Sequence, residues 1–174
     1  MERQRPRLSL VVAVDQNGGI GFQGQLLARV RGDLRHFRTL TEGKTVILGS
    51  KTLATFPGGK PLKNRRHIIL SRRADFAVEG AEVAHSAEEA LSLLRDGEEA
   101  FVIGGASVYS LLLPYVETAV VSRFEASFPA DAFFPDLGRD PAWELVSVGE
   151  KQVSEAGDEP AGMVWRILTY RRLR

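Results

Sequence analysis

Asp33 is the acidic residue best placed to do chemistry, because it is the only Asp or Glu in residues 16–41. It follows a glycine-rich stretch at 15–25 and opens a segment, 33–41, in which apolar residues recur at helical spacing. A carboxylate in that position can bind a cationic or amidine-like ligand through two parallel hydrogen bonds. The alternative is that Asp33 only caps its helix, a common role for acids in a first turn.

A glycine pair followed by the start of a helix marks a second candidate site, in the segment Ile103-Gly104-Gly105-Ala106-Ser107-Val108-Tyr109. Glycines let the backbone approach a phosphate closely, and the N-terminus of a helix supplies free N–H groups for an anion. The pattern differs from the GxGxxG sequence of dinucleotide-binding folds. An ordinary strand-to-helix turn is therefore the alternative.

Basic residues form the third feature. Residues 1–75 carry 15 Lys and Arg against 5 Asp and Glu, whereas residues 76–174 carry 8 against 17. A basic half indicates an anionic partner, such as nucleic acid, a phosphorylated cofactor or a carboxylate substrate, although solvated surface charge explains the count equally well. Without interleaved aromatic residues, and with a net charge of only +1, a nucleic-acid surface is disfavoured. The densest basic stretch comprises Lys60, Lys63, Arg65, Arg66, Arg72 and Arg73.

The composition excludes several other chemistries. With no cysteine, the chain has no disulfide, thiolate metal site or cysteine nucleophile. Its three histidines, His36, His67 and His85, are scattered, which argues against a metal site. No apolar run approaches the roughly 20 residues of a membrane helix. Residues 1–7 lack the pattern of a signal peptide, so we expect a cytoplasmic protein without a metal.

Short apolar runs predict strands, and helical spacing predicts the segments between them. The expected strands are 8–14, 45–48, 67–70, 100–103 and 118–124, and the expected helices are 33–41, 51–55, 86–94 and 108–113. Two further strands, at about 143–150 and 163–172, have no helix between them and are expected to pair antiparallel.

This order of elements predicts the fold class α/β. We expect a single-domain, doubly wound, mainly parallel sheet with an antiparallel C-terminal edge hairpin. The domain is expected to span residues 1–174, with its core at about 8–172. In open sheets of this kind, ligands bind beyond the carboxyl ends of the strands, where the 15–25 stretch and the Gly104-Gly105 turn both fall.

Taken in order, these segments resemble one family, dihydrofolate reductase, from about Leu8 to Arg172. No single motif is specific, but their order and spacing are. The segments that carry the resemblance are Val12-Ala13-Val14 with Gly19-Ile20-Gly21, Asp33-Leu34-x-x-Phe37, Val46-Ile47-Leu48-Gly49-x-Lys51-Thr52, Leu62 to Arg72, Ile103-Gly104-Gly105-x-x-Val108-Tyr109, and Phe134-Pro135-Asp136.

The resemblance implies that the protein reduces 7,8-dihydrofolate to 5,6,7,8-tetrahydrofolate by hydride transfer from NADPH, a reaction of one-carbon metabolism. It implies that Asp33 holds the pterin and supports protonation at N5, that Phe37 stacks on the pterin, and that Arg65 grips the glutamate tail. Dihydrofolate and antifolates are then the expected small-molecule partners, with no nucleic acid and no membrane, and the protein is expected to be a monomer.

The resemblance also implies two sets of binding residues and, as in family members, a cis peptide between Gly104 and Gly105. The implied substrate-binding residues are Val11, Val12, Asp33, Phe37, Arg65, Ile103, Tyr109 and Ser122, the last standing behind Asp33 as a hydroxyl. The implied cofactor-binding residues are Ala13, Ile20, Gly21, Gly49, Ser50, Lys51, Thr52, Leu70, Ser71, Arg72, Ile103, Gly104, Gly105, Ala106, Ser107, Val108 and Tyr109.

Four positions depart from the family's pattern. The family often has an aromatic residue where this chain has Ala28, and commonly Pro where it has Arg31, which bears on loop closure and antifolate affinity. Many members have Arg at the position of Ser50, and some have a basic residue at Ser107. Binding of the 2′-phosphate of NADPH is then left to Lys51, Ser71 and Arg72. We therefore expect only a modest preference for NADPH over NADH.

Two other functions fit the same scaffold. A pyrimidine reductase of the riboflavin pathway shares the fold and the cofactor, but Asp33 and Phe37 at their spacing favour a pterin over a ribose phosphate. A non-catalytic nucleotide-binding protein is the second alternative, and the intact Asp33 argues against it.

Overall fold

The computed structural model describes residues 6–173, and the chain divides into two compact units. The first unit contains the residues up to Leu10 together with Thr41–Val116, and the second contains Val11–Leu40 and the residues from Glu117 on. Strand β1 (Arg7–Val14) contributes residues to both. The expected lack of a signal peptide concerns mainly residues 1–5, which lie outside the described part of the chain.

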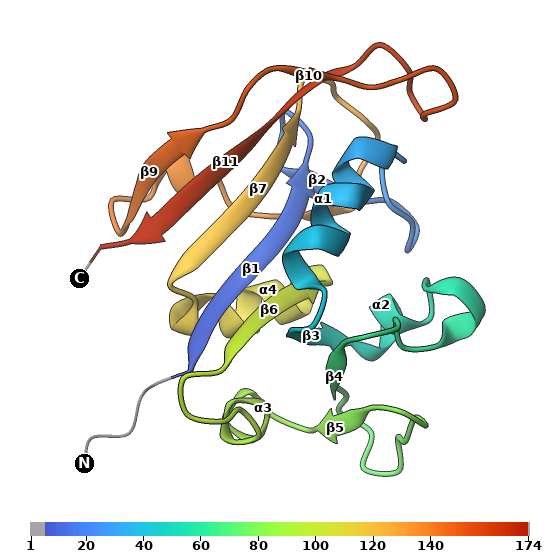
Figure 1. The fold of residues 1–174 in the computed structure, drawn as a ribbon, viewed down its shortest axis with the longest axis vertical. Helices are drawn as coiled ribbons and strands as arrows, with labels where there is room; N and C mark the ends of the chain where they lie inside the picture. Colours follow the sequence, from blue (N-terminus) through green and yellow to red (C-terminus); the bar gives the residue numbers. More distant parts are fainter. Residues whose placement is uncertain (1–5, 174) are drawn as a thin grey trace. The chain divides into compact units, whose positions relative to one another are not determined.

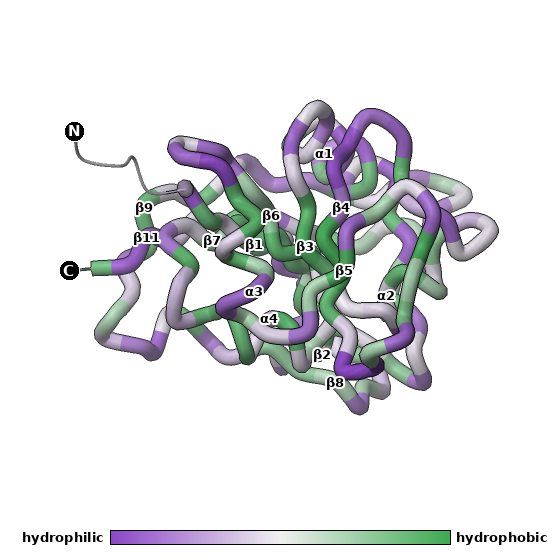
Figure 2. The backbone as a smooth tube through the Cα atoms, turned by 90° about the horizontal axis from the view of Figure 1, so that it is seen from below, coloured by the Kyte–Doolittle hydropathy of each residue, from purple (hydrophilic) through white to green (hydrophobic). Residues whose placement is uncertain are grey.

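The first unit is built on parallel strands. In spatial order they are the start of β1, β6 (Glu99–Gly104), β3 (Thr45–Gly49), β4 (Arg66–Leu70) and β5 (Glu82–Ala84). Strand β3 is apolar at every central position, and Val46, Ile47 and Leu48 are fully buried, as expected for a strand covered on both faces. Figure 2 shows the hydrophobic residues that run along β3, β4 and β6.

Short helices follow these strands. They are α2 (Ser50–Leu53), α3 (Ala87–Ser92) and α4 (Ala106–Leu112), with 3-10 turns η1 (Pro57–Gly59) and η2 (Leu113–Tyr115). At the start of α3 the Ser86 hydroxyl accepts a hydrogen bond from the backbone N–H of Glu89 at 3.0 Å. The Glu89 carboxylate in turn accepts from the backbone N–H of His85 at 2.9 Å, which closes the N-terminus of the helix.

The second unit contains antiparallel strands and the helix α1 (Arg31–Thr41). Strand β11 (Val164–Arg172) pairs antiparallel with β7 (Thr118–Phe124), β9 (Trp143–Val148) and β10 (Gln152–Val153), and Figure 1 shows β7, β11 and β9 side by side. Strands β2 (Gly19–Gly21) and β8 (Ala132–Phe133) form a separate pair, followed by the 3-10 turn η3 (Leu137–Arg139). The predicted C-terminal hairpin is therefore confirmed.

The α/β class and the parallel strands are confirmed, and the differences are local. Four strands of two or three residues, β2, β5, β8 and β10, were not predicted. Helix α1 begins at Arg31, two residues before the expected start, and α4 begins at Ala106 instead of Val108. Within residues 6–173, no helix is both long and apolar enough to cross a membrane.

Candidate active site

Asp33 lies in the first turn of α1, and its carboxylate is held by Ser122 of β7. The Ser122 hydroxyl donates to Asp33 Oδ1 at 2.5 Å, and Ser122 itself is 1% exposed. Burial raises the pKa of Asp33 above its ordinary value, because the charged form loses water, while the Ser122 hydrogen bond and the nearby His36 lower it. A carboxyl group of this kind can hold a proton nearer to neutral pH than an exposed aspartate.

His36 and Phe37 share a face of α1 with Asp33, because they follow it by three and four residues. Both are half-buried. The Nε2 atom of His36 is buried, without a hydrogen-bond partner among the residues that the structure describes. The face of α1 that carries the acid is thus lined by two ring side chains.

Val11, Val12 and Ala13 lie on β1, and Ile20 and Gly21 lie on the short strand β2. Val11 and Val12 are buried, whereas Ala13, Ile20 and Gly21 are half-buried. In the sequence these five residues lie on either side of the turn at 15–18, so their positions depend on how that turn is held.

Asp15 holds the turn. Its carboxylate is 1% exposed and accepts three backbone N–H groups, from Asn17 and Gly19 at 2.8 Å each and from Phe128 at 3.0 Å. A side chain at Gly19 would place its Cβ only 3.1 Å from the Asp15 carboxylate, so the close approach requires glycine. The start of the glycine-rich stretch is therefore fastened to the segment after β7.

A second link joins the same stretch to residue 131. The Asp131 carboxylate accepts the backbone N–H of Gln23 at 2.9 Å, and the backbone N–H of Asp131 donates to the Gly21 carbonyl at 2.9 Å. Because Ile20 and Gly21 lie between the two links, their backbone is fixed on both sides.

Arg31, one of the departures from the family's pattern, is fastened to Asp158. The Asp158 Oδ1 accepts both the backbone N–H of Arg31 at 3.2 Å and its Nε at 3.0 Å, and Arg31 Nη2 donates to the Ala156 carbonyl at 2.5 Å. The pKa of Asp158 is lowered, first by the backbone N–H of Glu155 and then by Arg31. An acid distant in sequence therefore receives the first N–H of the helix that carries Asp33.

Ala28, the other departure in this unit, packs against a cluster that contains Phe124 and Trp165. The two rings meet edge to face, with centroids 6.4 Å apart. The aromatic bulk beside this position therefore comes from strands β7 and β11 instead of from residue 28.

The predicted glycines of the first unit pack closely against Thr52, Val108 and Tyr109. A Cβ on Gly105 would lie 3.2 Å from the Thr52 hydroxyl, and a Cβ on Gly49 would lie 3.1 Å from the Val108 side chain. Gly104 has a φ of +128°, and a Cβ there would lie 3.5 Å from the Tyr109 hydroxyl. The Gly104–Gly105 peptide is cis, as the resemblance implied. The ends of β3 and β6 thus form a cradle that only glycine backbone fits.

The polar residues expected around a cofactor divide between covered and exposed positions. Ser71 is buried, and its hydroxyl accepts the backbone N–H of Arg73 at 3.2 Å. Lys51 and Arg72 are exposed, and no ion pair involves either of them within residues 6–173. Ser50 and Ala106 are half-buried, Ser107 is exposed and Leu70 is buried.

Arg65 is oriented by two acceptors within the first unit. Its Nε donates to the hydroxyl of buried Thr41 at 2.9 Å, and its Nη1 donates to the Lys63 carbonyl at 2.6 Å. The neighbouring His67 is buried and accepts the backbone N–H of Leu62 at Nε2, 3.0 Å away, while Nδ1 lies 3.2 Å from the Arg65 carbonyl. Burial lowers the pKa of His67, so the ring is neutral and holds the turn that carries Arg65.

The other basic residues of 60–73 are not equivalent. Arg66 is built into the unit, because it pairs with Glu82 at 2.8 Å and with Glu98 at 3.0 Å. Arg73 pairs with Asp75 on the surface at 3.4 Å. Lys60, Lys63 and Arg72 form no ion pair within residues 6–173 and are available to an anionic ligand. Within the described part of the chain, no group of His, Cys, Asp and Glu is arranged to hold a metal ion.

Comparison with known proteins decides the family. The family model "Dihydrofolate reductase" matches residues 7–172. The chain is 36% identical over 168 residues to the dihydrofolate reductase of Staphylococcus haemolyticus, with 97% of each chain covered. It is 37% identical over 169 residues to that of Mycobacterium tuberculosis, with 95% of this chain and 98% of the relative covered. The chain belongs to the dihydrofolate reductase family.

A solved dihydrofolate reductase shares the fold. The enzyme from Enterococcus faecalis, in complex with NADP(H) and RAB-propyl, superposes with a TM-score of 0.87 at 28% identity, covering 99% of this chain and 100% of that one. The family, the enzyme class and the fold class predicted from the sequence are thereby confirmed.

Two residues that shape this dihydrofolate reductase were missed from the sequence. Asp15 was considered only as the start of the glycine-rich stretch, although an Asp two residues before Asn-Gly is a common turn-forming signal. Asp158 gave no local signal at all, because its partner Arg31 is 127 residues away.

Proposed function

We propose that this protein reduces 7,8-dihydrofolate to 5,6,7,8-tetrahydrofolate with NADPH. The observation that carries the proposal is the Asp33–Ser122 pair, a carboxylate removed from water on the first turn of α1 and held by a buried hydroxyl. This pair stands in a chain that belongs to the dihydrofolate reductase family over residues 7–172.

Asp33 has two tasks in the proposed reaction. Its two oxygens accept hydrogen bonds from the amino group and ring N–H of the pterin, a bidentate contact that fixes the ring. Because burial penalises an isolated negative charge, the Asp33 carboxylate also favours a cationic ligand, here the protonated pterin, so that a proton is present at N5 when the hydride adds to the neighbouring carbon. In the second unit, Val11, Val12 and Phe37 are proposed to contact the ring, and Ile103 and Tyr109 of the first unit are proposed as further substrate-binding residues.

NADPH supplies the hydride when it is bound and leaves as NADP⁺. The glycine cradle at Gly49, Gly104 and Gly105 is proposed to hold this ligand, because it lies at the carboxyl ends of β3 and β6, where ligands bind in open sheets of this kind. Lys51 and Arg72 are proposed to meet the 2′-phosphate with Ser71 beside them, and Ile20 and Gly21 to contact the nicotinamide. The glutamate tail of the substrate is proposed to pair with Arg65, whose guanidinium is already oriented by Thr41.

The decisive assay follows loss of NADPH absorbance with three samples: dihydrofolate, the pyrimidine intermediate of riboflavin synthesis, and no added substrate. We expect NADPH to be oxidised only in the sample that contains dihydrofolate. Turnover with the riboflavin intermediate alone would assign the chain to the pyrimidine reductases on the same scaffold. Tight NADPH binding without turnover of either substrate would indicate a non-catalytic nucleotide-binding protein.

Asp33→Asn tests the role of the acid. Turnover at neutral pH is expected to fall by roughly 10²- to 10⁴-fold, the usual contribution of a positioned acid or base. Activity should recover as the pH falls, because the substrate is then protonated in solution. Glu42→Gln, an exposed acid at the end of α1, is the matched control and should retain full activity. A pH profile of Asp33→Asn that coincides with the wild-type profile would show that Asp33 acts only as a helix cap.

We further propose that the chain works as a single domain and as a cytoplasmic monomer that binds antifolates and does not bind nucleic acid. One family match running across both units supports the single domain. We expect a single cooperative thermal transition whose midpoint temperature rises with added NADPH. We also expect that light scattering gives the mass of one chain. Two separate transitions, or a mass of two chains, would contradict these proposals.

A further inference from the structure

A hollow of about 420 Å³ lies within the second unit, on strands β1, β7 and β11. Its lining contains none of the residues proposed to bind dihydrofolate or NADPH. Side chains alternate between the faces of a strand, so Val121 and Arg123 of β7 point away from the face on which Ser122 meets Asp33. The hollow therefore lies behind the strand that supports the catalytic acid.

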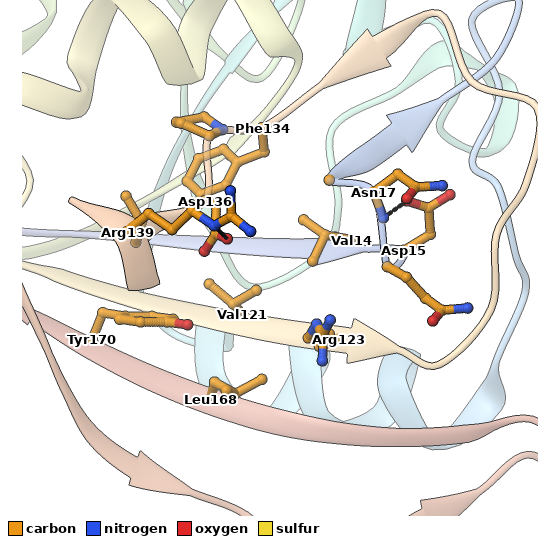
Figure 3. A pocket seen from close by; sticks show the side chains of 14 residues that line it. Val14, Asp15, Asn17, Val121, Arg123, Phe134, Asp136, Arg139, Leu168 and Tyr170 are labelled. Carbon is orange, nitrogen blue, oxygen red and sulfur yellow. Dashed lines mark hydrogen bonds and ion pairs between the residues drawn. The ribbon is translucent and has the colours of Figure 1, made fainter.

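The middle of this hollow is apolar. Val121 lies directly opposite Leu168 in the antiparallel pair of β7 and β11, and Val14 of β1 and the buried ring of Phe134 complete the apolar part. Figure 3 shows Val121 and Leu168 next to each other on neighbouring strands, with Tyr170 on one side of this pair and Arg123 on the other. A volume within the range of roughly 300–1,000 Å³ that is usual for ligand pockets, on an apolar base, suits a flat aromatic ring.

The two ends carry hydrogen-bond donors without partners. Arg139, which also lines the hollow, is paired with Asp136 at 3.5 Å. The side chain of Arg123 has no ion pair or hydrogen bond with any residue of the described part. Nor does the Tyr170 hydroxyl have a hydrogen-bond partner within residues 6–173. Burial, and then Asp136, raise the pKa of Tyr170, so its proton stays available for donation.

We propose that this pocket binds a small aromatic carboxylate. The ring would lie over Val121 and Leu168, and the carboxylate would pair with the guanidinium of Arg123, whose planar fork matches two carboxylate oxygens. Asp15 and Asp136 also line the pocket, and their repulsion is weaker for a carboxylate with one negative charge than for a phosphate with two. The Tyr170 hydroxyl is then free to donate to an acceptor at the far end of the ligand.

Occupation of the pocket also reaches the glycine-rich stretch. Asp15 to Gly18 form one of its walls, and the backbone N–H of Phe134 donates to the Gly18 carbonyl at 2.8 Å. A Cβ on Gly18 would lie only 2.8 Å from the Phe134 carbonyl, so the two segments cannot shift independently. A ligand that displaces Phe134 is therefore expected to move residues 18–21. This second effect rests on the proposed function, and it should lower turnover without competing with either substrate.

The binding test uses 2-naphthoate as the probe and the uncharged 2-naphthamide as its control, each titrated calorimetrically into the full-length protein. Saturable binding of 2-naphthoate is expected, with shifts of the backbone amide signals of Asn17, Gly18 and Arg123. Arg123→Gln should weaken binding by at least about tenfold, the loss expected for a charge-assisted hydrogen bond. Arg166→Gln is the matched control, because Arg166 lies opposite Arg123 but is paired with Glu125 at 2.6 Å. Arg123→Gln should keep normal basal activity.

Three outcomes would contradict the proposed binding site. These are no saturable binding, equal affinity in Arg123→Gln and wild type, or loss of binding when saturating NADPH and folate are present. Since calorimetry does not depend on turnover, an inactive enzyme that still binds 2-naphthoate through Arg123 would refute the proposed function and leave the pocket standing.

Discussion

At the scale of single residues, the proton affinity of Asp33 is set by opposing neighbours. Burial raises its pKa, whereas the hydroxyl of Ser122 and the charge of His36 lower it. The Ser122 hydroxyl donates to Oδ1 and so stabilises the ionised form. Ser122 thus restrains the tendency of the buried acid to hold its proton.

Removing this hydroxyl should move the pH dependence of the reaction. In Ser122→Ala the pKa of Asp33 rises further, so the fall in turnover at high pH is expected at a higher pH than in the wild type. Ser122→Thr keeps a hydroxyl and is expected to follow the wild-type profile. The measurement is the pH–rate profile of hydride transfer under single-turnover conditions. Coincident profiles of the Ala and Thr variants would show that the hydrogen bond does not tune the acid.

Arg65 offers a test of substrate recognition at the same scale. Arg65→Lys should raise KM for dihydrofolate and leave turnover of a tail-less dihydropterin almost unchanged, because lysine cannot form the bidentate pair with the tail carboxylate. Thr41→Val removes the acceptor for Arg65 Nε without touching the charge, so a smaller rise in KM is expected. If both substrates lose activity equally in Arg65→Lys, the residue has a structural role.

At the scale of elements, the N-terminus of α1 is fixed by a segment far away in sequence. Asp158 accepts the backbone N–H and the Nε of Arg31, and Arg29 and Glu159 exchange two backbone hydrogen bonds of 2.8 and 3.0 Å. The Asp158 side chain is 1% exposed, so its charge depends on these donors for compensation. The position of Asp33, two residues beyond Arg31, depends on the same contacts.

Asp158→Asn should therefore lower both the melting temperature and the turnover number. The pKa of Asp158 is lowered in the folded state, so its stabilisation is full above the ordinary Asp value of about 3.9 and is lost as the pH falls below it. Thermal unfolding of the variant should accordingly depend less on pH in the acid range. Glu155→Gln, which alters only the exposed end of the cluster, is the control. Equal melting temperatures for Asp158→Asn and the wild type would show that the contacts of Asp158 with Arg31 do not stabilise the fold.

The same elements show what the sequence could and could not reveal. The runs at 8–14, 45–48 and 118–124 are apolar at their buried positions except for Thr45 and Ser122, so their strands were predicted nearly to the residue. Strand β2 was missed because three residues have no periodicity, and its pairing partner Phe133 is distant. Helix α1 starts earlier than expected because Asp158, and not a local cap, receives its first N–H.

The candidate site was predictable where residue type and spacing carry the signal. Asp33, the Gly104-Gly105 pair and Arg65 all stand out in the sequence, and the family's pattern assigns them roles. The residues that hold the site in position were not predictable, because Asp15 and Thr41 act through hydrogen bonds to backbone or to distant side chains. For the same reason, the local sequence could not show that Arg66 pairs with two distant acids, Glu82 and Glu98.

At the scale of the whole molecule, folding redistributes the charge asymmetry of the sequence. The first 75 residues are strongly basic and the remainder acidic, but each unit draws on both parts. Counted over the sequence, the first unit carries 12 Lys and Arg against 10 Asp and Glu, and the second carries 11 against 12. Neither unit therefore generates a strong field of its own, and attraction of an anionic cofactor must come from nearby cations.

This local origin predicts how cofactor use responds to salt and to substitution. Between ionic strengths of about 0.05 and 0.3 M, kcat/KM for NADPH should change by no more than about threefold, because no large field is available to be screened. Arg72→Gln should lower kcat/KM for NADPH and leave that for NADH unchanged, since only NADPH carries the 2′-phosphate. Ser50→Arg should do the reverse, by adding a charge-assisted contact to the phosphate. A steep and equal loss with salt for both cofactors would instead point to long-range steering by the molecule as a whole, and an unchanged NADPH preference in Arg72→Gln would remove this residue from the phosphate site.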